Sequence, residues 1–384
     1  MNDEFLLPIY NPFPIQISRA KGIYMWDVSG RRYIDTFSGI GVLALGHADD
    51  DVKTAMKVKI DNYAHLSNYF LDPDAIEVAK TIVERTGQTG KVYFGNSGAE
   101  ANEAALKAIK KRKGGIISFV GNFHGRTMGS LSITGFEKLR KPFEPLVDGV
   151  TFLPFNDVSA FEEYMRKNGS KVSAVFLETL LGSGGLKTIT KEFTTSVMKF
   201  KEKYGFVLVA DEVQAGMGRT GKFYAYQHFE NLEPDIVTLA KSIGGGLPLS
   251  ATIFLGKNMN VFESGDHGST FAPNPIALAA SRVVLSKLTD EFIKAVEEKG
   301  KYFREKIISI QNEKIKEVRG MGLMIGVELF TDKGANLLKE GLKNGLLLNV
   351  VGGNTVRFLP ALNITFEEID EITDKFNKTL EGMD

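Results

Sequence analysis

The sequence predicts an α/β protein with a mainly parallel sheet in a large domain and a second, smaller α/β domain. Between about residues 90 and 255, short β-branched runs alternate with amphipathic helical patterns, which is typical of a parallel sheet covered by helices on both faces. After residue 285, charged helical patterns surround short strands instead. The length of 384 residues is sufficient for two domains.

The N-terminal segment, expected at 1–45, contains GIYMWDVSGRRYIDTFSGIG. This pattern predicts a small hairpin whose turn is Asp27-Val28-Ser29-Gly30. We expect the segment to pack with the small domain.

The large domain is expected at 46–275, with strands in the runs VYFGN, IISFVGN, VSAVFLE, FVLVADE, DIVTLAK and ATIFLG. Ligands of such sheets bind beyond the carboxyl ends of the strands, where several candidate residues fall. The small domain is expected at 276–384, with helices in DEFIKAVEEKGKYFREKIISI and FEEIDEITDKFNKTL and strands in LMIGVELF and TVRFLP.

Composition excludes several classes of function. The 47 basic and 47 acidic residues leave no formal net charge, which argues against nucleic acid as a partner. No apolar run approaches the roughly 20 residues that span a bilayer, and the start MNDEFLLPIYNPFP lacks the regions of a signal peptide. We therefore expect a cytoplasmic protein without a membrane partner. The chain has no cysteine, and its five histidines form no metal-binding motif, so no metal is expected.

Two polar residues end neighbouring strands. Asp211 follows the run FVLVA, and Lys241 follows DIVTLA 30 residues later. A carboxylate for the pyridine nitrogen and an amine for the aldehyde are what a protein needs to hold pyridoxal 5′-phosphate (PLP). Each motif alone has an ordinary alternative, since strands often end in Asp-Glu and a lysine before glycines is often a solvated loop residue. Their order and spacing favour the cofactor site.

The segments DEVQAGMGRTG and TLAKSIGGGLP resemble those of the class III PLP-dependent aminotransferases, of the acetylornithine/ornithine type. The resemblance extends from WDVSGRRYIDTFSGIGVLALGH through KPFEPLV to VRGMGLMIGVEL and VRFLP. It implies PLP as cofactor and the fold type I architecture, with a seven-stranded, mainly parallel sheet in the large domain.

The phosphate is expected at Ser97, Gly98 and Ala99. In GNSGAEANEAALK a strand and a turn lead into a helix, and a helix start offers free N–H groups and a positive dipole end. The pattern also fits a plain capped helix. The resemblance to the family's phosphate-binding motif favours the cofactor role.

The ring contacts follow from the resemblance. Phe123 in GNFHGRT corresponds to the family's stacking phenylalanine, with His124 beside it at the cofactor, and Val213 covers the opposite ring face. Gln214 is expected to donate to the phenolic oxygen of the cofactor.

Two residues are expected to be catalytic. Asp211 would bond to the protonated ring nitrogen, which makes the ring an electron acceptor. Lys241 would bond covalently to the cofactor and later move a proton between carbon atoms.

Thr270 in GDHGSTF resembles the threonine that reaches the phosphate of a neighbouring subunit. This implies a homodimer with active sites at the subunit interface.

Arginine is the preferred partner of substrate carboxylates, and Arg126 and Arg357 are the candidates. The resemblance implies that Arg126 binds the α-carboxylate of the ω-amino donor and that Arg357 binds the carboxylate beside the reacting carbon of glutamate. Surface ion pairing is the ordinary alternative for each.

One departure from the family concerns substrate choice. Relatives usually read EPIQGE before the cofactor aspartate, whereas this chain reads ETLLGS, so Ser183 stands at the second glutamate. In ω-aminotransferases that glutamate pairs with the second arginine while an ω-amino donor is bound. We expect this switch to be absent or built differently here.

The resulting hypothesis is transfer of the ω-amino group of an N-acylated diamino acid, most simply N-acetylornithine, to 2-oxoglutarate, giving a semialdehyde and glutamate, as in arginine biosynthesis. The alternatives are another ω-amino donor (4-aminobutyrate, ornithine or lysine), a PLP-dependent amino-acid racemase or epimerase, and a non-catalytic relative. A non-catalytic relative would be expected to have lost some of the cofactor-binding residues, and the sequence shows no such loss.

Overall fold

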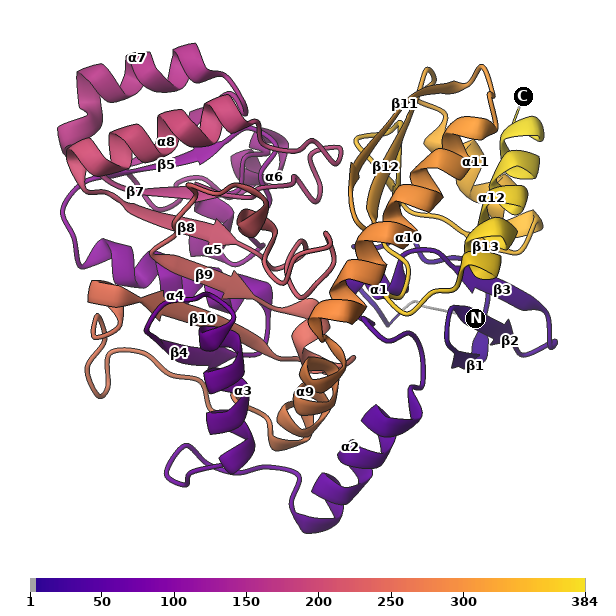
Figure 1. Ribbon diagram of the computed structural model, residues 1–384, viewed down its shortest axis with the longest axis horizontal. Coiled ribbons are helices and arrows are strands. Elements are labelled where there is room, and N and C mark those ends of the chain that lie inside the picture. Colours follow the sequence, from indigo (N-terminus) through magenta and orange to yellow (C-terminus); the bar gives the residue numbers. More distant parts are fainter. Residues whose placement is uncertain (1–4, 384) are drawn as a thin grey trace.

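The structure, a computed structural model, describes residues 5–383. The expected N-terminal segment and small domain therefore extend, at residues 1–4 and 384, outside the described residues. Figure 1 shows two α/β units side by side, with the long helix α10 (Asp290–Ser309) where they meet. Within residues 5–383, no helix has the length and apolar character needed to cross a bilayer.

A seven-stranded sheet forms the centre of the larger unit, which confirms the predicted fold class. Its strand order is β4-β10-β9-β8-β7-β5-β6. The strands span Gly90–Gly95 (β4), Gly115–Phe119 (β5), Val150–Leu153 (β6), Val172–Leu177 (β7), Val207–Asp211 (β8), Ile236–Leu239 (β9) and Ser250–Leu255 (β10). β10 runs antiparallel to the other strands of this sheet, which are parallel to one another. All six strands expected individually are present, and β6 is the seventh.

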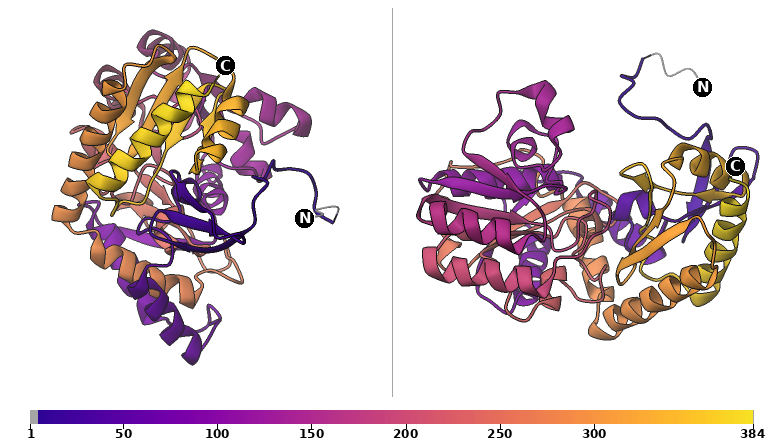
Figure 2. Two further views of the ribbon diagram at one scale, coloured as in Figure 1. Left: turned by 90° about the vertical axis from the view of Figure 1, so that its right-hand side faces the viewer. Right: turned by 90° about the horizontal axis from the view of Figure 1, so that it is seen from above.

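Helices cover both faces of this sheet (Figure 2). Along β8, Val207 and Val209 belong to the hydrophobic cluster of α4 (Gly98–Lys110), whereas Leu208 and Ala210 belong to that of α7 (Val158–Asn168) and α8 (Lys191–Tyr204). Successive strand residues point to opposite faces, and both faces are buried, so the strand sequence is continuously apolar.

The smaller unit contains a four-stranded antiparallel sheet in the order β11-β12-β15-β14. Its elements span Ile315–Met321 (β11), Met324–Leu329 (β12), Gly334–Lys343 (α11), Val350–Val351 (β14), Thr355–Phe358 (β15) and Phe366–Glu381 (α12). The expected helices and strands of this region are therefore present.

The predicted N-terminal hairpin is also confirmed. Strands β1 (Ile17–Lys21), β2 (Tyr24–Asp27) and β3 (Arg32–Asp35) form a sheet with β13 (Leu346–Leu347), which runs parallel to β3. At the turn, the N–H of Gly30 donates to the carbonyl of Asp27 over 3.0 Å. The N-terminal segment thus shares a sheet with a strand of the C-terminal region.

The remaining helices are α1 (Ser38–Gly41), α2 (Asp50–Asn62), α3 (Pro73–Glu84), α5 (Met128–Ser132), α6 (Glu137–Arg140) and α9 (Pro275–Lys287). Helix α9 packs against α2 and α3, so its contacts lie with the larger unit. The expected division at residue 276 would fall in the first turn of this helix. We propose that the domain boundary lies after it, near Thr289.

Arg219 joins the two units. It lies in the loop after β8, is only 1 % exposed, and donates from Nη1 to the carbonyls of Leu323 and Pro360. Its Nε and Nη2 atoms have no hydrogen-bond partner within the described part of the chain. Leu323 connects β11 to β12, and Pro360 follows β15. The guanidinium therefore links the loop after β8 to the four-stranded sheet of the smaller unit by hydrogen bonds.

A close backbone contact in the smaller unit leads to a stability prediction. A Cβ added at Gly300 of α10 would lie 2.0 Å from the carbonyl oxygen of Gly322. Gly300→Ala should therefore lower the free energy of unfolding by about 2 kcal/mol, although alanine favours the helix by about 1 kcal/mol. The measurement is the midpoint of urea unfolding.

Glu298→Ala, at an exposed position of the same helix, is the matched control and should change stability by less than about 0.5 kcal/mol. An unchanged or higher midpoint for Gly300→Ala would contradict the packing described for α10.

Candidate active site

A cavity of about 490 Å³ lies at the carboxyl ends of the parallel strands. It is lined by all but two of the residues expected at the site: Ser97, Gly98, Ala99, Phe123, His124, Arg126, Ser183, Asp211, Val213, Gln214 and Lys241. The two others, Thr270 and Arg357, do not line it. Residues that are up to 144 positions apart in the sequence, from Ser97 to Lys241, therefore meet in one place.

One wall of the cavity is the N-terminus of α4. Ser97 caps the helix, and its hydroxyl accepts from the N–H of Glu100 over 3.2 Å. The N–H groups of Gly98 and Ala99 make no hydrogen bond with any described residue. A Cβ at Gly98 would lie 2.7 Å from Cγ1 of Val213, so only glycine fits between the helix and this side chain. Two free N–H groups at a helix start can bind a phosphate.

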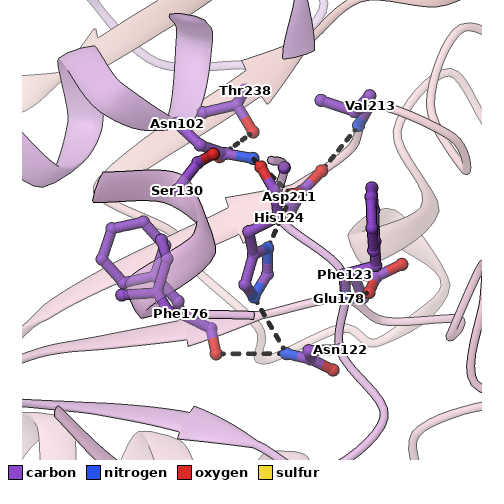
Figure 3. Close-up of polar contacts among 12 residues, drawn as sticks. Asn102, Asn122, Phe123, His124, Ser130, Phe176, Glu178, Asp211, Val213 and Thr238 are labelled. Atoms are coloured by element: carbon purple, nitrogen blue, oxygen red, sulfur yellow. Dashed lines mark hydrogen bonds and ion pairs between the residues drawn. The ribbon is translucent and has the colours of Figure 1, made fainter. Parts of the chain in front are cut away.

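Asp211 ends β8 and is 4 % exposed (Figure 3). Its Oδ2 accepts from Nδ2 of Asn102 over 2.8 Å and lies 2.7 Å from Nδ1 of His124. Its Oδ1 accepts from the N–H of Val213 over 3.0 Å. Asn102 is itself oriented, because its Oδ1 accepts from the hydroxyl of Thr238. The carboxylate is therefore held in one orientation by groups from three segments.

Lys241 directly follows β9, and its side chain lines the cavity. Its backbone adopts the left-handed conformation, with φ of 52°, which is unusual for a residue other than glycine. Such strain is frequent at functional sites. Its Nζ makes no hydrogen bond or ion pair within residues 5–383. Burial and then the charge of Arg357 lower the pKa of Lys241 to about 8, against the opposing charges of Asp211 and Glu178.

Glu178, at the end of β7, supports the loop that carries Phe123. Its Oε1 accepts from the N–H of Phe123 over 2.6 Å, and its Oε2 accepts from the N–H of Gly182 over 2.8 Å. Burial and the nearby charge of Asp211 raise the pKa of Glu178 above its ordinary value. Glu178 and Asn102 line the cavity but were not among the expected site residues. Two sequence patterns could have identified them. Glu178 is an acidic residue directly after a buried strand, and Asn102 is an amide among the alanines of AEANEAALK.

The two arginines differ in environment. Arg126 is exposed at the cavity and its guanidinium carbon lies 5.7 Å from the ring centre of Phe123. Arg357, on β15, is 4 % exposed and donates to the carbonyl of Gly182 (2.7 Å), Oε1 of Gln214 (3.1 Å) and Oδ1 of Asn349 (2.9 Å). All three acceptors are neutral.

Arg357 therefore has no carboxylate partner in the part of the chain that the structure describes. Burial lowers its pKa to about 10. Ser183 lines the cavity nearby but makes no hydrogen bond to this guanidinium. The expected glutamate switch is thus replaced by fixed, neutral acceptors.

Thr270 lies in an exposed loop of its own chain. The adjacent Ser269 accepts hydrogen bonds from Asn68 over 2.9 Å and from Asn96 over 3.1 Å. The loop therefore runs beside the start of α4 without placing Thr270 at the cavity wall.

The residues of the cavity fit PLP. Unpaired N–H groups suit its phosphate, the unpaired amine of Lys241 suits its aldehyde, and the oriented acceptor Asp211 suits its ring nitrogen. The described residues contain no cluster of three His, Cys, Asp or Glu side chains that could hold a metal ion.

Sequence comparison identifies relatives over almost the whole chain. The family model described as "Aminotransferase class-III" matches residues 8–380. The acetylornithine aminotransferase of Caldanaerobacter subterraneus subsp. tengcongensis is 41 % identical over 379 residues, covering 96 % of this chain and 95 % of that protein. The acetylornithine aminotransferase of Aquifex aeolicus is 39 % identical, covering 95 % and 97 %.

Structure comparison gives the same picture. The ornithine aminotransferase of Toxoplasma gondii ME49 superposes with a TM-score of 0.91 at 30 % identity, covering 98 % of this chain and 92 % of that one. The N-acetylornithine aminotransferase of Stenotrophomonas maltophilia K279a superposes with a TM-score of 0.83 at 33 % identity, covering 96 % of both chains.

The environment of Lys241 predicts its titration. In cofactor-free protein reductively methylated with ¹³C-formaldehyde, one dimethyl-lysine resonance should titrate near pH 8, because burial and Arg357 disfavour the charged amine. The resonance should be absent from Lys241→Ala and present in Lys138→Ala, which alters an exposed lysine. A midpoint above pH 10 for Lys241 would contradict the described environment.

Proposed function

The chain belongs to the class III aminotransferase family, as its motifs predict, and on this premise we propose that it transfers the ω-amino group of an N-acylated diamino acid to 2-oxoglutarate. We propose N-acetylornithine as the donor, because the curated relatives at 39 to 41 % identity are acetylornithine aminotransferases. The products are a semialdehyde and glutamate, as in arginine biosynthesis. The cytoplasmic location stays a prediction.

The observation that carries this proposal is the meeting of Lys241 and Asp211 at one cavity. The enzyme is PLP-dependent, and bound PLP supplies an acceptor for the electron pair released at the reacting carbon of the substrate. Asp211 would accept a hydrogen bond from the protonated ring nitrogen and stabilise its positive charge. Lys241 would hold the cofactor through its Nζ, and the same amine would carry a proton between the reacting carbon atoms.

The other cavity residues position the ring. We assign the phosphate to Ser97 and to the free N–H groups of Gly98 and Ala99, and the two ring faces to Phe123 and Val213. His124 contacts Asp211 rather than solvent, so its role at the cofactor is exerted through that carboxylate.

Gln214 is assigned to the phenolic oxygen. Its Oε1 already accepts from Arg357, which leaves its Nε2 as the donor that this oxygen requires.

The substrate carboxylates are assigned to the two arginines. Arg126, exposed at the cavity, binds the α-carboxylate of the donor, and Arg357 binds the carboxylate beside the reacting carbon of glutamate or 2-oxoglutarate. With Ser183 in place of a glutamate, Arg357 stays available for a carboxylate in both half-reactions.

We also propose a homodimer in which Thr270 reaches the phosphate of the partner. Apolar side chains are exposed in the loop between α2 and α3 and beside Thr270, namely Tyr69 (97 %), Leu71 (86 %) and Phe271 (68 %). Clustered exposed apolar side chains are typical of protein interfaces.

Racemisation or epimerisation of an amino acid is the second candidate, because a permanently available Arg357 suits a single substrate type with a carboxylate at the reacting carbon. It requires no oxo acid. Incubation of amino acids in deuterated water without oxo acid separates the two functions, since only a racemase inverts the substrate with uptake of solvent label.

The proposed reaction predicts a donor preference. With 2-oxoglutarate, kcat/KM for N-acetylornithine should exceed that for ornithine, 4-aminobutyrate and lysine by about tenfold or more. Lys241→Ala should lower kcat by about a thousandfold or more, whereas Lys257→Ala, at an exposed lysine, should not change it. Turnover that persists without oxo acid would contradict the aminotransferase assignment as the main activity.

The dimer proposal is tested with hybrid dimers. Thr270→Ala dimers should bind PLP about tenfold more weakly, because a phosphate hydrogen bond is lost. A hybrid of one Lys241→Ala chain and one Thr270→Ala chain should keep one complete site, with about half the wild-type turnover at low PLP. A hybrid as weak as the Thr270→Ala dimer would show that Thr270 acts within its own chain.

A further inference from the structure

Asn122 and Asp211 lie at opposite edges of the imidazole ring of His124 (Figure 3). Its side chain is fully buried, and Nδ2 lies 3.2 Å from Nε2 of His124 and 3.4 Å from the carbonyl oxygen of Phe176. Its Oδ1 has no hydrogen-bond partner within residues 5–383. The backbone of Asn122 is held separately, by Phe119 and Gly135.

The carbonyl of Phe176 determines which way the amide faces. A carbonyl oxygen only accepts, so the NH₂ group of Asn122 must point toward it, and Oδ1 must point away. The two hydrogens of Nδ2 are then available for two acceptors, the carbonyl of Phe176 and Nε2 of His124. Nε2 therefore carries a lone pair and no proton.

A neutral imidazole without a proton on Nε2 carries it on Nδ1. Nδ1 is the atom that lies 2.7 Å from Oδ2 of Asp211, so His124 donates to the carboxylate. Asp211 then accepts hydrogen bonds from His124, Asn102 and the N–H of Val213, the arrangement that suits an acceptor-only carboxylate.

We propose that Asn122 is a positioning residue that holds His124 neutral with its proton on Nδ1, and so keeps Asp211 a charged acceptor. With the proton on Nε2, Nδ1 and Asp211 would face each other as two acceptors. With both nitrogens protonated, the imidazolium would cancel the charge that Asp211 presents to the cavity.

Among residues 5–383, no donor other than Asn122 contacts a ring nitrogen of His124. Its N–H donates to Thr134, its carbonyl accepts from Asn102, and its ring packs edge-on against Phe176 at 5.8 Å. The charged or titratable groups that face it are Asp211 on β8 and Glu178 at the end of β7. Asp211 favours a proton on Nδ1, and Asn122 disfavours one on Nε2; the consequence for catalysis rests on the proposed role of Asp211.

The primary test needs no cofactor and measures the wild-type chain. In cofactor-free protein labelled with ¹⁵N in its five histidines, His124 should show a protonated Nδ1 and an unprotonated Nε2 at neutral pH. The signal is identified by its loss in His124→Gln. A proton on Nε2 of wild-type His124 would overturn the proposal, and this result is independent of the enzyme's reaction.

Asn122→Asp supplies the second test. A carboxylate at this position accepts from Nε2, so both nitrogens of His124 should become protonated in the cofactor-free protein. In the loaded enzyme kcat should fall about tenfold or more, with KM for the donor changed by less than about twofold, since no substrate contact is altered.

Asn231→Asp, at an exposed position, is the matched control and should change neither signal nor turnover. An unchanged His124 signal in folded Asn122→Asp would overturn the proposal. A changed signal with unchanged kcat would keep the tautomer assignment but contradict the role of Asp211. If Asn122→Asp does not fold, the wild-type spectrum still decides the tautomer.

Discussion

The arrangement of the site depends on one buried negative charge. Asp211 lies at the end of a fully buried strand, where an unpaired carboxylate would cost several kcal/mol. It is stabilised by donors from α4, from the loop after β5 and from its own turn. These segments come together only when the sheet and α4 are assembled. The charge therefore requires the strand order, the placement of α4 and the orientation of the loop that carries Phe123. In the proposed function, this charge is the acceptor for the ring nitrogen of the cofactor.

Most of the fold could be predicted because apolar runs and helical periods are local signals. β6 was not identified as a strand because it is four residues long, lies at the sheet edge, and is only partly buried, so it lacks the continuous apolar run of β7 and β8. The direction of β10 could not be predicted, since ATIFLG has the same pattern in either direction. The proposed end of the larger unit rests on the packing of α9 against α2 and α3, which is a long-range contact without a signature in composition.

The site residues that could be predicted stand at strand ends or in motifs. Those that could not depend on neighbours distant in the chain. Asn102 is 109 residues from Asp211, and Glu178 is 55 residues from Phe123, yet each orients its partner directly. Asn122 lies in the segment GNFHGRT, but its proposed effect depends on the carbonyl of Phe176, whose position cannot be predicted from the sequence. The missing glutamate at Ser183 was visible, whereas its replacement by neutral acceptors around Arg357 required the structure.

Arg219 affects the relative position of the two proposed carboxylate-binding arginines. On the proposed roles, Arg126 belongs to the larger unit and Arg357 to the smaller one, so the two carboxylate sites lie on opposite sides of the junction of the units. Arg219 fastens that junction through the carbonyls of Leu323 and Pro360. The separation of the two carboxylate sites is then a property of inter-unit geometry. Substitutions at the junction can change it while every side chain that lines the cavity stays the same.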